Sequence, residues 1–185
     1  VEVVEVEDDR EDDQADTDFS SEAMKSEGAS AIEEELRAAI QTAQDESGNR
    51  YGGLRATYTL ALLEWDLGNF QAAIDAYTAV AAQFPESHLT GPALSGAAAA
   101  YEELGDVERS MTTLQQLVDL DASTAALERP RALFNLGRLA ETQADMEAAR
   151  EYYNQLVDEH AGSSWTNLAR DRILWLNSRR ATQEG

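Results

Sequence analysis

Residues that could catalyse a reaction or bind a metal are few and poorly spaced in this sequence. It contains two histidines, His88 and His160, and no cysteine. His160 follows Asp158 and Glu159 and could ligate a metal with them. A solvent-exposed loop histidine is the favoured alternative, because no second histidine lies at ligand spacing. Adjacent acids elsewhere are typical of solvated helix faces, and no phosphate-binding glycine loop is present. The sequence therefore predicts no enzyme, no metal site and no cofactor.

Aromatic and arginine side chains recur at helical spacing, a combination that suits protein recognition. Residues three and four apart share one face of a helix. Two such sets are predicted to bind a partner: Arg55, Tyr58, Leu62 and Trp65, and further along Arg131, Phe134 and Arg138. Smaller residues, Ser95, Ala99 and Glu102, form the set between them. The surface would fit a peptide or helix with apolar anchors and some acids. The alternative is that the rings pack against neighbouring helices.

A second basic group lies near the C-terminus and consists of Arg170, Arg172, Arg179 and Arg180. One interpretation is a docking site for an acidic partner or for the acidic N-terminal tail. The favoured interpretation is charge that complements the dipole at the end of a helix.

The chain is strongly acidic, with a formal net charge of −22 over 185 residues. Nucleic-acid binding needs a basic surface, so no nucleic-acid partner is predicted. Lys25 is the only lysine, against 13 arginines. High Asp and Glu with Arg in place of Lys resembles the composition of halophilic proteins, whose carboxylate surfaces stay hydrated when salt screens them. An ordinary acidic protein from a GC-rich genome is the alternative.

The N-terminal residues 1–20 are mostly charged and cannot bury enough apolar surface to offset their ordering entropy. They are predicted to form a disordered acidic linker before a helical domain over 21–185. The chain begins at Val1 without methionine, which predicts a segment of a longer protein with a signal or membrane anchor upstream. No run of about 18 apolar residues is present, so this segment is predicted not to span a membrane.

The first predicted helix covers residues 29–48. Ile32, Leu36 and Ile40 recur every four residues and form the stripe of an amphipathic helix. A turn is predicted at Gly52-Gly53.

Three later segments share one order of elements: 54–87, 91–124 and 130–163. Each is predicted to form a helix, a turn, a second helix and a loop. Turn-to-turn spacings of 37 and 39 residues are typical of a stacked repeat array. The predicted turns contain Gly68 and Gly105, which tolerate the left-handed conformation, and Ala144 at the third. A last helix over 164–180 is predicted to cap the array.

Small residues recur where the two helices of each unit would cross. They are Ala61, Ala98 and Gly137 in the first helices and Ala73, Ser110 and Ala149 in the second helices. A larger apolar residue follows four positions later: Tyr77, Leu114 or Tyr153. This pattern predicts close packing within each unit.

Leu136-Gly137 followed by Ala149 and Tyr153 resembles the tetratricopeptide consensus. So does Gly68-Asn69-Phe70 with Ala73, Tyr77 and Pro85. The resemblance covers about Leu54 to Ser163; Thr57, Ala122, Ala144 and Ala161 depart from it. It implies an all-α, right-handed superhelical solenoid of about eight helices: one N-terminal helix, three pairs and a capping helix. It also implies that a protein or peptide partner binds the concave groove lined by the first helices.

Two joints between units, over 84–94 and 160–176, resemble those of bacterial envelope repeat proteins, including the ancillary Sec translocon subunit and the Tol–Pal coordinator. This resemblance implies a non-catalytic scaffold that assists assembly or translocation of other proteins. It further implies a periplasmic location with an N-terminal membrane tether; a cytoplasmic location is the alternative. The alternative function is an architectural or self-associating module of a larger protein. Neither the partner's identity nor the oligomeric state follows from the sequence.

Overall fold

The structure is a computed structural model that describes residues 12–47, 51–121, 124 and 126–183. These residues form eight α-helices and no strand, as the all-α prediction requires. The helices are α1 (Asp12–Ser47), α2 (Tyr51–Asp66), α3 (Phe70–Gln83), α4 (Thr90–Glu103), α5 (Val107–Asp119), α7 (Arg129–Thr142), α8 (Met146–Glu159) and α9 (Ser164–Gln183).

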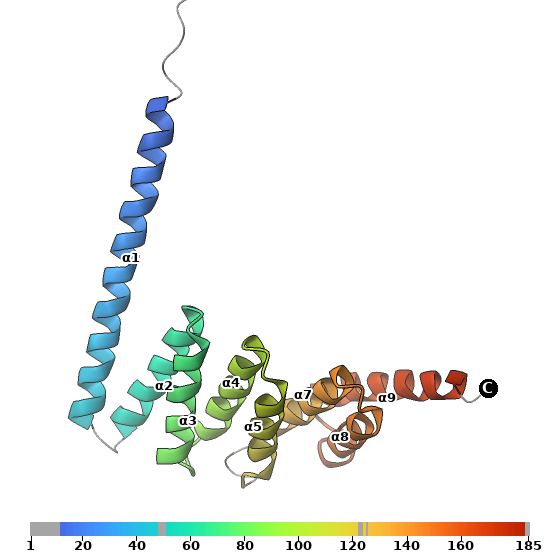
Figure 1. The fold of residues 1–185 in the computed structure, drawn as a ribbon. Coiled ribbons are helices and arrows are strands. Elements are labelled where there is room, and N and C mark those ends of the chain that lie inside the picture. Colours follow the sequence, from blue (N-terminus) through green and yellow to red (C-terminus); the bar gives the residue numbers. More distant parts are fainter. Residues whose placement is uncertain (1–11, 48–50, 122–123, 125, 184–185) are drawn as a thin grey trace, which may run out of the picture.

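The helices stack as three antiparallel pairs between two end helices (Figure 1). The pairs are α2–α3, α4–α5 and α7–α8, each packed on the next through α3–α4 and α5–α7. Helix α1 packs on α2 at one end, and α9 packs on α8 and α7 at the other. The array is open, so α1 and α9 lie at its opposite ends.

Helix α1 is longer than predicted. It begins at Asp12, so residues 12–20 are helical although they were predicted as linker. The physical reason is local, since no proline or glycine occurs between 12 and 27. Acidic residues also interact favourably with the positive end of the helix dipole. The remaining part of the predicted linker, residues 1–11, lies outside the described residues.

Gly52 and Gly53 do not form the predicted turn, because α2 begins at Tyr51 and includes both. A Cβ on Gly52 would lie 2.5 Å from the Oγ of Ser47 at the end of α1. The glycine therefore allows the end of α1 to approach the start of α2 closely.

The turns within the three pairs share one backbone conformation. Gly68 and Gly105 have φ of 74°, and Ala144 has φ of 62°. The predicted left-handed backbone conformation is confirmed at both glycines, and Ala144 adopts the same conformation. A left-handed alanine costs roughly 1–2 kcal/mol relative to a right-handed one, so packing of the third pair must impose this conformation.

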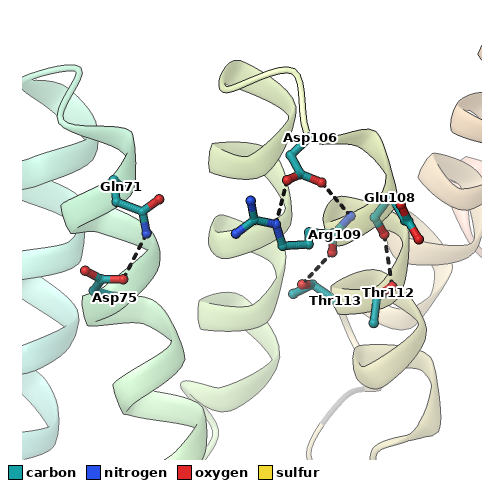
Figure 2. A network of polar contacts seen from close by, with 7 residues as sticks. All are labelled: Gln71, Asp75, Asp106, Glu108, Arg109, Thr112 and Thr113. Carbon is teal, nitrogen blue, oxygen red and sulfur yellow. Dashed lines mark hydrogen bonds and ion pairs between the residues drawn. The ribbon is translucent and has the colours of Figure 1, made fainter.

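Aspartates cap the helices that follow two of these turns. The carboxylate of Asp106 accepts the backbone N–H of Arg109 at 3.0 Å and its Nε at 2.5 Å (Figure 2). Asp145 accepts the N–H of Ala148 at 3.0 Å in the same way. An Asp cap typically stabilises a helix by about 1 kcal/mol, which helps to offset the cost of the Ala144 conformation.

The predicted small residues at the helix crossings are buried. Gly137 packs so closely that a Cβ there would overlap the ring of Tyr153. Tyr153 is fully buried, as are Ala61 and Ala73 in the first pair. The close packing expected from this pattern is therefore present.

Candidate protein-binding surface

Two pockets are lined by residues that were predicted to bind a partner, and the first lies between α2 and α4, facing the start of α7. Its volume is about 430 Å³. Four residues predicted to bind a partner line it: Tyr58, Leu62, Trp65 and Arg131. The predicted partner residue Arg55 is exposed and does not line it.

This pocket is hollow because its two walls differ in side-chain size. Helix α2 presents large rings, whereas α4 presents Gly96 and Ala99. A Cβ on Gly96 would lie 2.6 Å from the ring of Tyr77, so Tyr77 rests against the backbone of α4. Tyr58 meets Tyr77 edge-on, with ring centroids 5.8 Å apart. Burial raises the pKa of Tyr77 to about 12 and also raises that of Tyr58, so both rings stay neutral.

The second pocket, of about 410 Å³, lies where α7, α8 and α9 meet. The predicted residues Phe134 and Arg138 line it together with Glu141, Thr142, Tyr153 and Arg172. Phe134 packs between two other rings, 5.6 Å from Tyr153 and 5.3 Å from Trp165 by centroid distance. Its ring therefore packs against neighbouring rings, as the alternative interpretation expects, and it also lines this pocket.

One ion pair and one hydrogen bond connect α7 to α4 along this face. Arg138 Nη2 lies 2.6 Å from Glu102 Oε2, which joins α7 to α4. Arg131 also reaches from α7 to α4 by donating to the Ser95 hydroxyl, and it pairs with Glu128 at 2.7 Å. These two arginines are thus already neutralised within the chain. Arg55 has no ion-pair partner among the described residues and is exposed, so it could meet an acidic group of a partner.

In the second pocket, Glu141 accepts hydrogen bonds from two neighbouring side chains. It accepts from Arg172 Nε at 3.0 Å and from the Tyr153 hydroxyl at 2.7 Å. Burial by itself would raise the pKa of Glu141, but these hydrogen bonds hold it below its usual value. Burial and the neighbouring carboxylate raise the pKa of Tyr153. Glu141 is thus an ionised structural group, unsuited to proton transfer near neutral pH.

The candidate metal ligand His160 follows the last residue of α8, and its Nε2 lies 4.0 Å from Glu159. Within the part of the chain that the structure describes, no three His, Cys, Asp or Glu side chains are placed to hold a metal ion. The same part contains no helix that is long and apolar enough to cross a bilayer.

Helical spacing found six residues of α2 and α7 that line the pockets but missed Glu141 and Thr142 of α7 and the residues of other helices that complete the pockets. Tyr77 and Tyr153, predicted only as packing residues, line one pocket each. Glu128 was not predicted, and Arg172 was predicted only as part of the basic C-terminal group. Their side chains reach the pockets only because neighbouring units stack, and that stacking has no local signal in the sequence.

Comparison with known proteins agrees with this geometry. A tetratricopeptide repeat family model matches residues 58–123 and 95–164, which together make up more than half of the chain. No curated protein matches the chain in sequence.

Several solved structures have a similar fold. A tetratricopeptide repeat protein from Parabacteroides merdae matches with a TM-score of 0.61 and 17% identity over 88% of this chain; the chain spans only 59% of that protein. A putative kinesin light chain repeat protein from Podosopora anserina matches with a TM-score of 0.63 and 17% identity, over 92% of this chain and 89% of that one. PcrH, solved in complex with the chaperone binding region of PopB, matches with a TM-score of 0.52 and 16% identity, over 70% of this chain and 98% of PcrH.

None of these comparisons singles out the Sec or Tol–Pal proteins. They agree with the stacked helix pairs. The chain belongs to the tetratricopeptide repeat family and is an all-α repeat solenoid.

Proposed function

We propose that the chain is a non-catalytic scaffold that holds a peptide or helix of another protein against the face formed by its first helices. The observation that carries this proposal is the pair of pockets, each with aromatic walls and a rim of paired charges. Aromatic anchors in preformed pockets dominate the energy of many interfaces. PcrH, whose fold is similar, was solved with a bound segment of another protein, which supports this use of the fold.

The arrangement of the pockets suggests the chemistry of the bound segment. Two apolar side chains would fill the two pockets, and polar residues between them would cross the Arg138–Glu102 pair. Because the chain carries −22 and the lining arginines are neutralised, a segment without net negative charge is favoured. An acidic group of the segment could pair with Arg55, which is exposed.

The first prediction concerns Leu62, which lines the α2–α4 pocket and is 42% exposed. Leu62→Glu should weaken binding of peptides selected on the wild-type chain from a random display library by about 30-fold. That factor corresponds to about 2 kcal/mol, as expected for a charge placed in an apolar pocket. Fluorescence anisotropy with labelled peptides measures the change. Trp65 is less suitable for this test because it also packs on Phe70.

Leu104→Glu is the matched control. Leu104 is 49% exposed, just after α4, and does not line either pocket. It should leave the affinity unchanged. Equal affinities for the Leu62 and Leu104 variants would show that the selected peptides bind elsewhere, and the proposal would fail.

The second prediction tests the proposed adaptation to salt. With a net charge of −22, self-repulsion should destabilise the fold in dilute buffer. At 1 M salt the Debye length falls to about 3 Å, which relieves this repulsion. The melting temperature by circular dichroism should therefore rise between 20 mM and 1 M NaCl. A constant or falling melting temperature would reject the saline interpretation.

We also propose that the protein works in the bacterial envelope, tethered to a membrane, where it assists assembly or translocation of other proteins. Support comes from the resemblance of the two joints over 84–94 and 160–176. The third prediction is that the natural full-length protein sediments with membranes and is degraded when protease enters the periplasm. Recovery from the soluble cytoplasmic fraction would contradict this location.

A further inference from the structure

The two pockets are one site that the chain builds twice, first around α2 and α3 and again around α7 and α8. Five residues that line the second pocket each lie 76 positions after a residue that lines the first. The pairs are Tyr58 and Phe134, Leu62 and Arg138, Trp65 and Glu141, Tyr77 and Tyr153, and Gly96 and Arg172.

The backbone keeps the same register. The left-handed turn residues Gly68 and Ala144 are also 76 positions apart. Thr90 donates its hydroxyl at 2.6 Å to the carbonyl six residues earlier, and Thr166, again 76 positions on, does the same at 2.5 Å. Residues 76 positions apart therefore hold equivalent places, so the differences between them show how the two pockets differ in chemistry.

The second pocket supplies its own partner for its buried tyrosine. The Tyr153 hydroxyl donates to Glu141 at 2.7 Å, and Glu141 also accepts from Arg172 Nε at 3.0 Å. The polar end of Tyr153 is thus satisfied within the chain. A side chain that enters this pocket needs only to be apolar.

The first pocket has no such partner. Trp65 and Gly96 stand at the positions of Glu141 and Arg172, so the equivalent carboxylate and guanidinium are missing. Tyr77 is 3% exposed, and its hydroxyl makes no hydrogen bond to any residue that the structure describes. Leaving a buried hydroxyl unpaired is costly. The first pocket therefore offers a hydrogen-bond donor to a side chain that enters it.

The charges around the first pocket favour a neutral group next to this hydroxyl. Glu128 is the one carboxylate among its lining residues, and it already pairs with Arg131 at 2.7 Å. Asp66 acts on the Tyr77 hydroxyl by charge, but it is exposed and does not line the pocket. An ion pair with an exposed carboxylate contributes little. An incoming carboxylate would be repelled by the same acids.

Tyrosine has the matching chemistry. Its ring is large and apolar, and its hydroxyl both accepts and donates hydrogen bonds. Phenylalanine and leucine have no acceptor, and a methionine sulfur is a weak one. Asparagine and glutamine have an acceptor but lack a ring to pack against Leu62 and Trp65.

We propose that the bound segment places a tyrosine in the first pocket, with its ring against Leu62 and Trp65 and its hydroxyl accepting a hydrogen bond from Tyr77. The side chain in the second pocket is apolar and has no polar end. This inference rests on the proposed function and adds the property that distinguishes the two pockets. Because the two anchors are not interchangeable, the segment binds in one direction along the array.

The first test uses the chain alone. Tyr77→Phe removes only the hydroxyl and should leave the midpoint of urea unfolding unchanged, because that hydroxyl has no partner among the described residues. Tyr153→Phe removes a bonded hydroxyl at the equivalent position and should lower the midpoint. Equal losses for the two variants would mean that Tyr77 is also bonded within the chain, and the proposal would be wrong.

The second test uses peptides selected on the wild-type chain from a random display library, with affinities from fluorescence anisotropy. Peptides that Leu62→Glu weakens occupy the first pocket. Each should contain a tyrosine whose replacement by phenylalanine weakens binding to the wild type about fivefold to tenfold, the effect of one buried hydrogen bond. The same replacement should change the affinity for the Tyr77→Phe chain less than about twofold, since this chain has lost the donor.

Tyr51→Phe is the matched control, because Tyr51 is an exposed tyrosine of α2 that lines neither of the two pockets. It should keep the full preference for a tyrosine in the peptide. Three results would overturn the proposal: first-pocket peptides anchored by arginine, lysine or leucine, a preference that survives in Tyr77→Phe, or a preference lost in Tyr153→Phe. If Leu62→Glu weakens no selected peptide, the proposed function itself fails, which distinguishes the two failures.

Discussion

Replacing Tyr153 with alanine is expected to lower the free energy of unfolding by about 3–5 kcal/mol. Tyr153 is fully buried, its ring packs against Gly137 and Phe134, and its hydroxyl donates to Glu141 at 2.7 Å. Removing the ring leaves a cavity where α7, α8 and α9 meet, and no single neighbouring side chain can move to fill it. Urea unfolding followed by circular dichroism measures the change as a lower midpoint.

Two further variants separate the contributions of Tyr153. Tyr153→Phe keeps the ring and should cost only about 1–3 kcal/mol, the penalty for leaving Glu141 short of one donor. Gly137→Ala should cost about 1–3 kcal/mol in the wild type, because the new Cβ overlaps the ring. In the Tyr153→Ala background the same change should become neutral or stabilising, since alanine is the better helix former.

Tyr51→Ala is the control for this prediction, because Tyr51 is an exposed tyrosine in α2. It should change the unfolding free energy by less than about 1 kcal/mol. If Tyr153→Ala were no more destabilising than Tyr51→Ala, the packing described around α8 would be wrong.

Arg37→Ala is expected to lower the free energy of unfolding, because it leaves a buried carboxylate without its cation. Glu64 of α2 is 6% exposed and accepts from Arg37 Nε at 2.5 Å and Nη2 at 3.0 Å. Asn69 donates a third hydrogen bond at 2.8 Å. The expected cost is below that of a fully buried pair, since water reaches part of the Arg37 side chain. Chemical denaturation measures it, and hydrogen exchange in α1 should rise as the helix loses this contact.

The same pair predicts how stability depends on pH. The hydrogen bonds from Arg37 hold the pKa of Glu64 below its ordinary value of 4.5. Because the folded pKa is the lower one, the stabilisation is complete above pH 4.5 and is lost as pH falls through the folded pKa. Arg37→Ala should therefore lose less stability than the wild type on acidification from pH 6 to pH 3.

Arg109→Ala is the matched control. Arg109 also pairs with a carboxylate, that of Asp106 at 2.5 Å, but both groups lie at the surface. Exposed pairs contribute about 0–1 kcal/mol, so this variant should lose much less stability than Arg37→Ala. Equal losses for the two arginines would contradict the special role of the buried Glu64.

The sequence by itself determined the helix pairs, their turns and the face that lines the pockets. These features depend on neighbours three or four residues apart, or on the backbone freedom of a single residue. Tyr58, Leu62 and Trp65 share a face wherever α2 lies, and Gly68 and Gly105 form the same left-handed turn. The start of α1 is also a local property: the high charge of residues 12–20 predicts disorder, whereas these residues form the N-terminal part of a helix.

Only the tertiary structure decided which side chains meet across units. Arg37 meets Glu64, Arg138 meets Glu102 and Arg172 meets Glu141, at separations of 27, 36 and 31 residues. Loop lengths and the tight fit at Gly96 and Gly137 set how successive helices align. That alignment neutralises arginines that spacing alone suggested were free.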